Sequence, residues 1–522
     1  MHDLIILGGT VYDGFGGAGI TADVAIADGR VTAIGTDLGP AHDCIDADGL
    51  AVTPGFVDPH THSDTVPFMS DPQPFKLLQG VTTEIVGNCG YTCAPTDSDH
   101  SAEVAAEMGH VFPRFADYLD AVDAAGTTNH LAALVGHNTL RIAVAGFERK
   151  LPSGGLERMC ELADEAFAAG AVGWSSGLEY VPGAYAARDE LIALAHVARR
   201  WGASYATHMR NEGEGLLDAV DEAIAVARAG GIRLQVSHCK VSGHAAHGAA
   251  PRLLARIIQA RLSGVDVLGD LYPYEACSTG LVAVLPTIAS EGGESRLRDR
   301  LADPQERLRL RRIAEDPVEF VGAGLWREIG PDDLTVTRHA DPTVVGRTLT
   351  DITGDRDPWD TLCELLLTDL SADTVLHVMR ADDVETFMQS PLISIGSDND
   401  VPTGLVHPRT YGTFPRFLGT YVRDRQIVSL GEAVRKMTSA TASQFGLSDR
   451  GWLGRGAAAD VCVFDPAAVD HAGSYSHPET PPVGMHWVLL QGIPVIRDRQ
   501  FTGERRGRLL RAGTREAASP LG

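Results

Sequence analysis

Short apolar runs recur through the middle of the chain, and each ends in polar or reactive residues before a stretch of helical spacing begins. Apolar runs of this length, rich in β-branched residues and bounded by glycine, are typical of buried strands. The predicted strands are VTPGFVD (52–58), VTTEIVGN (81–88), HLAALVGH (130–137), AVGWSSG (171–177), ASYATH (203–208), RLQVSH (233–238), VDVLGDLYPY (265–274) and LISIGSD (392–398).

The segments between these runs have the pattern of amphipathic helices. After His208, for example, apolar residues fall at helical spacing over 216–229, and a Gly-Gly pair ends the pattern. Strands that alternate with helices predict an α/β fold, and eight such units predict a (β/α)8 TIM-like barrel. We expect the barrel to occupy 53–430. Because that is longer than the usual ~250 residues, we place an insertion at about 283–346, between strands seven and eight.

The two ends of the chain share a different pattern, with short alternating strands and glycine turns. LIILGGTVYDG near the start resembles HWVLLQGIPVIRD near the end. We expect residues 1–52 and the later part of 431–522 to build one small β-sandwich domain, after a helix that opens the second segment. The alternative is two unrelated β tails, each of which would have a marginal core. We interpret the basic segment 503–515 as a solvated tail.

Composition limits the possible partners and the location. The 522 residues carry a formal net charge of −25, which argues against nucleic acid and anionic membrane surfaces as partners. The N-terminus has no basic segment of the kind that opens a signal peptide, and no apolar stretch approaches the length of a membrane span. The eight cysteines are scattered and suggest no disulfide framework. We therefore predict a cytoplasmic protein; the oligomeric state stays open.

Reactive side chains follow several of the predicted strands. His60 and His62 come directly after the first strand, and two imidazoles on one face of an extended segment can bind one metal ion. Chance could supply one such pair among 19 histidines. However, Cys89, His208 and His238 follow other strands in the same way. Because the carboxyl ends of barrel strands meet at one face, the sequence predicts a metal site there.

With these residues assembled, the chain resembles the D-aminoacylase (N-acyl-D-amino-acid deacylase) family of the amidohydrolase superfamily. The resemblance extends over nearly the whole chain. The segments that carry it are GFVDPHTHSD, GVTTEIVGNCG, YATHMRNEG, VSHCK, GSD and HPRTYGTFPRFLG, followed by the closing segments 429–447 and 450–466.

The resemblance implies zinc-dependent hydrolysis of the amide bond of N-acyl-D-amino acids, with one tightly bound ion and a second weak one. It implies that His60 and His62 are ligands of the weaker position and that Cys89, His208 and His238 hold the tighter one. It also implies that Asp398 is the catalytic general acid/base. The chemistry agrees, because a thiolate with two imidazoles suits zinc better than magnesium or calcium.

Four other residues near these strand ends are predicted to support the site or the fold, and not to bind metal themselves. His137 is predicted to support the metal ligands or to be structural, rather than to be a ligand itself. Cys93 lacks a partner motif and is predicted to be structural, since buried cysteines usually act as small apolar residues. Asp58 is expected to support the metal site or to pack beneath it. For Asp270, a supporting role and a purely structural one both stay open.

The substrate would be a small molecule, an N-acyl amino acid, whose carboxylate needs cations in a chain of this charge. Lys240 and Arg409 lie near the active face, and the family's pattern adds Tyr180, Tyr272 and Ser278 as substrate-binding candidates. Alternatively, both cations simply pair with surface carboxylates of the protein. Residues 278–286 (STGLVAVLP) contain no cation, so we expect neutral or apolar D-residues to be preferred over D-aspartate and D-glutamate.

Two other functions compete with this one. A cyclic amidase of the hydantoinase or dihydroorotase type usually has a carboxylated lysine after the fourth strand, and the region GWSSGLEYVPG has no lysine. A catalytically dead scaffold would have lost ligands or the aspartate, yet all of them are present.

Overall fold

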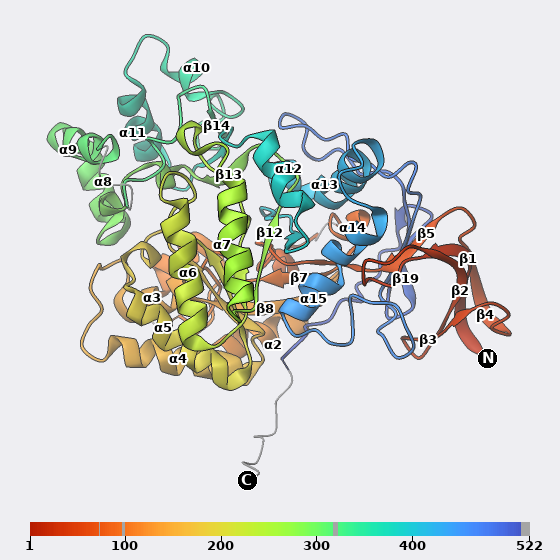
Figure 1. The fold of residues 1–522 in the computed structure, drawn as a ribbon. Coiled ribbons are helices and arrows are strands. Elements are labelled where there is room, and N and C mark those ends of the chain that lie inside the picture. The colour runs from red at the N-terminus through yellow and green to blue at the C-terminus, as the bar shows by residue number, and fades with distance from the viewer. Residues whose placement is uncertain (72–73, 97–99, 317–321, 513–522) are drawn as a thin grey trace.

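In the computed structural model, which describes residues 1–71, 74–96, 100–316 and 322–512, a parallel barrel forms the centre of the molecule (Figure 1). Every neighbouring pair of its strands is parallel. A parallel bridge between Thr61 and Asn399 brings the first and last strands together. The order is β6 (Phe56–Asp58), β7 (Val81–Val86), β8 (His130–Gly136), β9 (Gly173–Gly177), β10 (Ser204–His208), β11 (Leu234–Val236), β12 (Val267–Leu271) and β16 (Ile393–Ile395).

Helices cover the outside of the barrel, as the spacing of apolar residues predicts. In α6 the buried side chains include Leu216, Val220 and Ile224, and Gly231 ends the helix in the left-handed conformation. The main covering helices are α2 (Phe115–Ala125), α3 (His137–Ala145), α4 (Gly155–Ala169), α5 (Arg188–Trp201), α6 (Leu216–Gly230), α7 (Ala250–Leu262), α12 (Ala381–Gln389) and α14 (Leu430–Met437). The prediction of a (β/α)8 barrel is confirmed.

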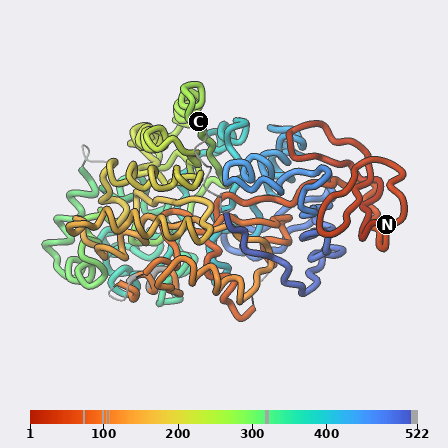
Figure 2. The backbone as a smooth tube through the Cα atoms, turned by 90° about the horizontal axis from the view of Figure 1, so that it is seen from below, coloured from red at the N-terminus to blue at the C-terminus, as the bar shows by residue number. Residues whose placement is uncertain are grey.

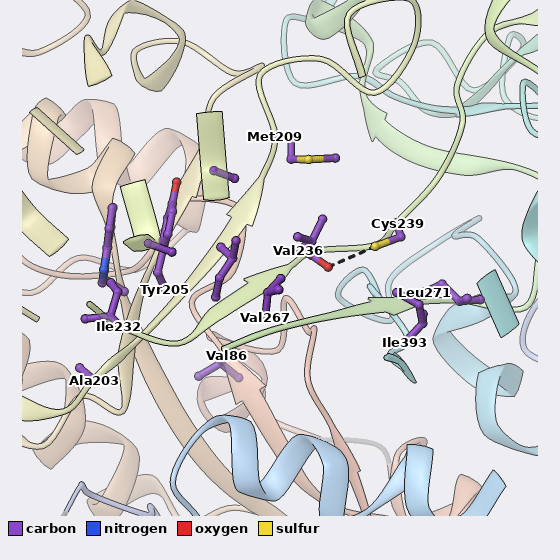
Figure 3. Packing of buried hydrophobic residues seen from close by; sticks show 14 of the residues in the cluster. Val86, Ala203, Tyr205, Met209, Ile232, Val236, Cys239, Val267, Leu271 and Ile393 are labelled. Carbon is purple, nitrogen blue, oxygen red and sulfur yellow. Dashed lines mark hydrogen bonds between the residues drawn. The ribbon is translucent and has the colours of Figure 1, made fainter. Parts of the chain in front are cut away.

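Apolar side chains of neighbouring strands share one buried cluster with side chains of the covering helices, which fixes the strands relative to one another. Figure 3 shows Tyr205, Val236 and Val267, from β10, β11 and β12, among the residues of this cluster. These side chains are shielded from solvent, and close packing of this kind leaves a strand little freedom to shift. The carboxyl ends of the strands are therefore held in fixed positions relative to one another.

Strands from both ends of the chain share one β-domain, which confirms the prediction. Figures 1 and 2 show the N-terminal strands beside the C-terminal ones. Val52 of β5 (Ala51–Pro54) pairs with Val463 of β17 (Val461–Phe464) in an antiparallel register. The remaining strands of this nine-stranded sheet are β1 (His2–Val11), β2 (Ile20–Ala27), β3 (Arg30–Gly35), β4 (Ala41–Asp46), β18 (Met485–Leu490), β19 (Ile493–Arg497) and β20 (Gln500–Phe501).

The first predicted strand, 52–58, is in fact two strands in different sheets. Residues 51–54 belong to the β-domain and residues 56–58 to the barrel. Gly55 stands between them, where a Cβ atom would meet the Thr82 side chain at 2.2 Å. Both strands are buried, so a single apolar run carries the chain from one core into the next. The division into 1–52, 53–430 and 431–522 remains a proposal, and 513–522 lies outside the described residues.

A separate small domain stands between β12 and β16. Its antiparallel sheet has the order β13 (Cys277–Gly280), β15 (Asp373–Leu376), β14 (Leu334–Arg338). Its helices are α8 (Gly293–Ala302), α9 (Pro304–Ala314), α10 (Leu349–Thr353) and α11 (Pro358–Thr368). It has its own core around Leu301, Leu334 and Trp359. The insertion therefore extends to both sides of the predicted 283–346, of which 317–321 is not described.

The basic C-terminal segment is not simply a solvated tail. Leu131 of β8 donates its N–H to Arg508 O at 3.0 Å, and Leu510 N donates to Leu131 O at 2.7 Å. Arg511 lies 2.9 Å from both Asp120 and Asp123 of α2. Residues 507–512 thus dock along the barrel, which corrects the prediction for that part of the segment. Among the described residues, none of the helices combines the length and apolar character that crossing a membrane requires.

Candidate metal centre

The carboxyl ends of five barrel strands bring the predicted metal and catalytic residues to one place. His60, Cys89, His208, His238 and Asp398 follow or end β6, β7, β10, β11 and β16 respectively. Three of them have left-handed backbone conformations, with φ of 53° at Cys89, 31° at His238 and 50° at Asp398. Such conformations cost a non-glycine residue about 1–3 kcal/mol each and cluster at functional sites.

Cys89, His208 and His238 form the first group, here called the inner position. Cys89 Sγ lies 3.9 Å from His208 Nδ1 and 3.5 Å from His238 Nε2, and these two nitrogens are 2.9 Å apart. The three residues are 5%, 3% and 2% exposed. The glycine after Trp174-Ser-Ser allows this approach, because a Cβ atom at Gly177 would meet the carbonyl oxygen of Cys89 at 2.1 Å.

The inner position has donors of the kind that zinc prefers, grouped closely enough to share one ion. Around a tetrahedral zinc ion, sulfur and nitrogen donors lie roughly 3.3–3.6 Å apart; the three separations here, 2.9 to 3.9 Å, bracket that range. Burial lowers the pKa of His208 to about 4 and that of His238 well below its ordinary value, so both rings are neutral, as metal binding demands. Burial also raises the pKa of the Cys89 thiol, and a cation at Sγ would oppose that rise.

A carboxylate stands behind each imidazole of the inner position. Glu179 Oε2 lies 2.9 Å from His208 Nε2, and Glu212 Oε1 lies 3.0 Å from His238 Nδ1. Each ring therefore presents one nitrogen to Cys89 and the other to an acid. In metalloproteins this arrangement fixes the ring's orientation and raises its basicity as a ligand.

His60, His62, Cys89 and Asp398 form a second group, here called the outer position. Asp398 Oδ1 lies 3.1 Å from His62 Nε2 and 3.3 Å from His60 Nε2, and the latter nitrogen is 3.2 Å from Cys89 Sγ. Cys89 is thus common to both positions. The His62 side chain is 32% exposed, whereas His60 is fully buried.

Asp398 also contacts a cation. Arg409 Nη1 lies 2.7 Å from Asp398 Oδ2. Burial favours a higher pKa for this carboxyl, but Arg409 and His60 outweigh it and hold the pKa of Asp398 well below its usual range. The carboxylate therefore remains ionised and able to accept a proton.

The predicted substrate-binding residues surround the same face. The Arg409 guanidinium stacks over the Tyr272 ring at 4.6 Å, and its Nη2 donates to the Ser278 carbonyl oxygen at 3.4 Å. The Tyr180 ring packs against His208, with centroids 4.5 Å apart, and its hydroxyl accepts a hydrogen bond from Thr279. Lys240 and Arg409 both have carboxylate partners, Glu212 and Asp398, so the alternative reading of these cations stays open.

A buried polar network supports the site from below. Asp58 Oδ1 accepts the backbone N–H groups of His60 at 3.2 Å and Ser397 at 3.0 Å, and Lys76 Nζ contacts Asp58 Oδ2 at 2.7 Å. One carboxylate therefore joins the ends of β6 and β16. Asp270 holds the end of β11, since its Oδ1 accepts the His238 N–H at 2.7 Å.

The two residues expected to be structural lie away from the metal groups. His137 Nε2 contacts Glu190 at 2.7 Å, and Cys93 is completely buried. Neither belongs to any of the groups of potential ligands among the described residues.

Sequence reasoning missed the acids behind the site. Glu212 carries a usable signal, because it follows His208 by four residues, within a turn-rich NEGEG segment. Glu328 carries none, since it lies in the insertion, yet its Oε1 accepts a hydrogen bond from Asn211 beside Glu212. Burial and neighbouring acids raise the pKa of both Glu179 and Glu328 to about 8.

Comparison with known proteins identifies the family. A model described as "Amidohydrolase family" matches residues 43–271 and 370–480, and so omits most of the insertion. D-aminoacylase of Alcaligenes xylosoxydans xylosoxydans is 35% identical, over 97% of this chain and 97% of its own length. The chain belongs to the amidohydrolase family, in its D-aminoacylase and N-acyl-D-amino-acid deacylase group.

Two further members show how closely this amidohydrolase follows the group. N-acyl-D-glutamate deacylase from the same organism is 36% identical, over 99% of this chain and 98% of its own. The crystal structure of N-acyl-D-glutamate deacylase from Bordetella bronchiseptica, complexed with zinc and a phosphonate inhibitor, superposes with a TM-score of 0.84. It is 34% identical and covers 98% of this chain and 99% of its own. This protein is thus a metal-dependent amidohydrolase.

Proposed function

We propose that this amidohydrolase hydrolyses the linear amide bond of N-acyl-D-amino acids with zinc, releasing a carboxylate and a free D-amino acid. The observation that carries the proposal is the placement of Asp398 within 3.3 Å of His60 and His62, next to a buried cysteine and two neutral imidazoles. The names of the relatives, which specify deacylases of D-amino acids, support the same substrate class.

The residues divide the chemistry between them. Cys89, His208 and His238 would hold the tighter ion, and His60 and His62 the weaker one. A bound zinc ion supplies a Lewis acid, which polarises a carbonyl and acidifies water. Asp398 takes a proton from the attacking water and delivers it to the leaving nitrogen. Its low pKa keeps it in the basic form at the start of the reaction.

The substrate's carboxylate would be recognised by Arg409 and Lys240. Arg409 is fixed by Tyr272 beneath its guanidinium plane, and a rigid fork of donors binds a carboxylate well. Ser278, whose carbonyl oxygen accepts from Arg409, and Tyr180, which packs against His208, would complete the binding site. Arg409→Ala or Lys240→Ala should raise KM or lower kcat/KM about 10-fold or more, the loss of a charge-assisted bond, and should leave the zinc in place.

The preference for the amino-acid side chain stays a prediction. Strand β13 and the residues after it, up to Pro286, contain no lysine or arginine. A second substrate carboxylate would therefore find no cation there to pair with, and burying it unpaired is costly. Wild-type enzyme should hydrolyse N-acetyl-D-leucine and N-acetyl-D-methionine faster than N-acetyl-D-glutamate. Similarity does not decide this, because D-aminoacylase and the D-glutamate deacylase are almost equally close.

One screen tests the proposal against its alternatives. Zinc-loaded enzyme is given N-acetyl-D-leucine, N-acetyl-L-leucine, N-acetyl-D-glutamate and a hydantoin, and release of free amine or ring opening is measured. Turnover confined to the L-isomer or to the cyclic amide would overturn the substrate class, and no turnover at all would favour a scaffold.

All eight cysteines are free thiols, in line with the cytoplasmic location that remains a prediction.

A further inference from the structure

Glu212 lies behind the metal centre and contacts both the predicted metal ligands and a predicted substrate cation. Its Oε2 is 2.6 Å from Lys240 Nζ and 3.7 Å from His208 Nε2, while its Oε1 is 3.0 Å from His238 Nδ1. The residue is 4% exposed. One carboxylate thus contacts two proposed zinc ligands, His208 and His238, and one proposed substrate-binding residue, Lys240.

The loop that carries Glu212 is itself held in place. Asn211 Oδ1 accepts the backbone N–H groups of Gly213 at 3.0 Å and Gly215 at 2.7 Å. The Glu212 carbonyl oxygen accepts the N–H of Ser242 at 2.9 Å, which ties the loop after β10 to the segment after β11. The carboxylate is therefore positioned by backbone contacts and does not need a ligand to order it.

We propose that Glu212 is a positioning residue that holds Lys240 and the His238 ring as one unit, and so couples metal binding to binding of the substrate carboxylate. The inference rests on the proposed function, because it takes His238 as a zinc ligand and Lys240 as a carboxylate binder. It adds an energetic link between two sites that the proposed function treats as separate.

The link follows from the hydrogen positions on one ring. Lys240 Nζ and Glu212 Oε1 both approach His238 Nδ1, at 2.7 Å and 3.0 Å. In the tautomer whose Nε2 is free for a metal ion, Nδ1 carries the hydrogen, and the acceptor within reach is Glu212 Oε1, which lies 3.0 Å away and has no other hydrogen-bond partner among the described residues. Lys240 then cannot donate to Nδ1. An ammonium has three donors, so one of them is released for a carboxylate while Glu212 still holds another.

The test measures binding in place of turnover. In an Asp398→Asn background, which slows hydrolysis, N-acetyl-D-leucine and N-acetyl-D-leucinamide are titrated by calorimetry with and without zinc. The amide lacks the carboxylate and reports every effect of zinc that does not involve Lys240. We expect zinc to tighten binding of the acid at least about 10-fold more than binding of the amide.

The acid excess is the factor by which zinc tightens binding of the acid beyond its effect on the amide. Glu212→Gln should abolish the acid excess and should weaken zinc affinity about 10–100-fold, the usual effect of losing a partner behind a metal-binding histidine. Glu214→Gln is the matched control, since Glu214 is in the same loop and pairs at the surface with Arg327. Glu214→Gln should keep the wild-type zinc affinity and the acid excess. If Glu212→Gln does not fold, the double variant Glu212→Gln, Lys240→Met removes the unpaired charge and should show weak zinc binding with no acid excess.

Different results would contradict the coupling by Glu212 and the role of Lys240. Wild-type zinc affinity together with a retained acid excess in Glu212→Gln overturns the coupling but leaves the proposed function intact. Equal binding of the acid and the amide by the Glu212-containing protein, with no effect of Lys240→Met, overturns the role of Lys240 and the coupling together.

Discussion

The inner and outer metal positions share Cys89 but differ in what lies behind their other donors. At the inner position both imidazoles are buried, and each has a carboxylate within 3.0 Å of its second nitrogen. At the outer position His62 is 32% exposed, and Asp398 is already bound to Arg409 at 2.7 Å. The nearest acid to His60 Nδ1 is Asp270, at 3.5 Å, beyond a good hydrogen bond.

This difference teaches that similar donors need not bind metal with similar strength. Oriented, neutral imidazoles with acids behind them favour a permanent ion, so we expect the inner position to be the tight one. A carboxylate shared with an arginine is a poorer permanent ligand, and its lowered pKa keeps it ionised. The outer position is therefore the one compatible with the proton transfer that we propose for Asp398.

The largest effect should come from the residue that both positions share. Cys89→Ala removes a donor from each position. Zinc affinity should therefore fall by at least about 100-fold, which is more than the loss of a hydrogen-bond partner behind a ligand costs, and activity should fall with it. Elemental analysis after dialysis measures the zinc content. Cys93→Ala is the matched control, a buried thiol four residues away that should leave zinc bound. Full zinc occupancy in Cys89→Ala would remove it from the ligand set.

Asp398→Asn should separate proton transfer from metal binding. Asparagine keeps the shape but cannot accept a proton, so kcat should fall about 10²–10⁴-fold, the scale of general acid–base catalysis. The inner position does not include Asp398, so one zinc ion per chain should remain. Steady-state kinetics with N-acetyl-D-leucine and a zinc assay measure both quantities. A variant within a few-fold of wild-type kcat contradicts the assigned role.

A pair of histidine variants sharpens the contrast between the positions. His208→Ala should lose zinc at nanomolar to micromolar free metal, whereas His62→Ala should keep one ion and lose only the weaker second one. Zinc titrations monitored by calorimetry count the sites in each variant. If His62→Ala loses the tight ion and His208→Ala keeps it, the two positions have been ranked in the wrong order.

The smallest effect on activity should come from Asp58, which lies under both strand ends. Asp58→Asn leaves the buried Lys76 charge with the more distant Glu84, at 3.6 Å, as its carboxylate partner, so thermal unfolding should show a loss of at most about 3–5 kcal/mol, with kcat reduced about 10-fold. Asp58→Asn combined with Lys76→Met should recover much of the stability but not the rate. Recovery of both would show that the pair serves stability alone.

The sequence revealed the catalytic face because each reactive residue ends an apolar run that only a buried strand explains. It did not reveal that Gly55 divides the first run, since both halves are equally apolar. The insertion was placed too narrowly because β13 and β15 pair with each other across about a hundred residues, and no local pattern reports such pairing. Glu328 was missed because an acid among surface arginines looks solvated.

The pairing of β5 with β17 has a consequence for how the protein is made. The histidines of the active site begin two residues after β6, and β6 is joined through Gly55 to β5, which pairs on one side with β1 and on the other with residues 461–464. During synthesis the second of these partners leaves the ribosome long after β1 and the barrel's first strands. The sheet next to the first metal-binding segment is therefore completed only when most of the chain has been made, and contacts this distant in sequence slow folding.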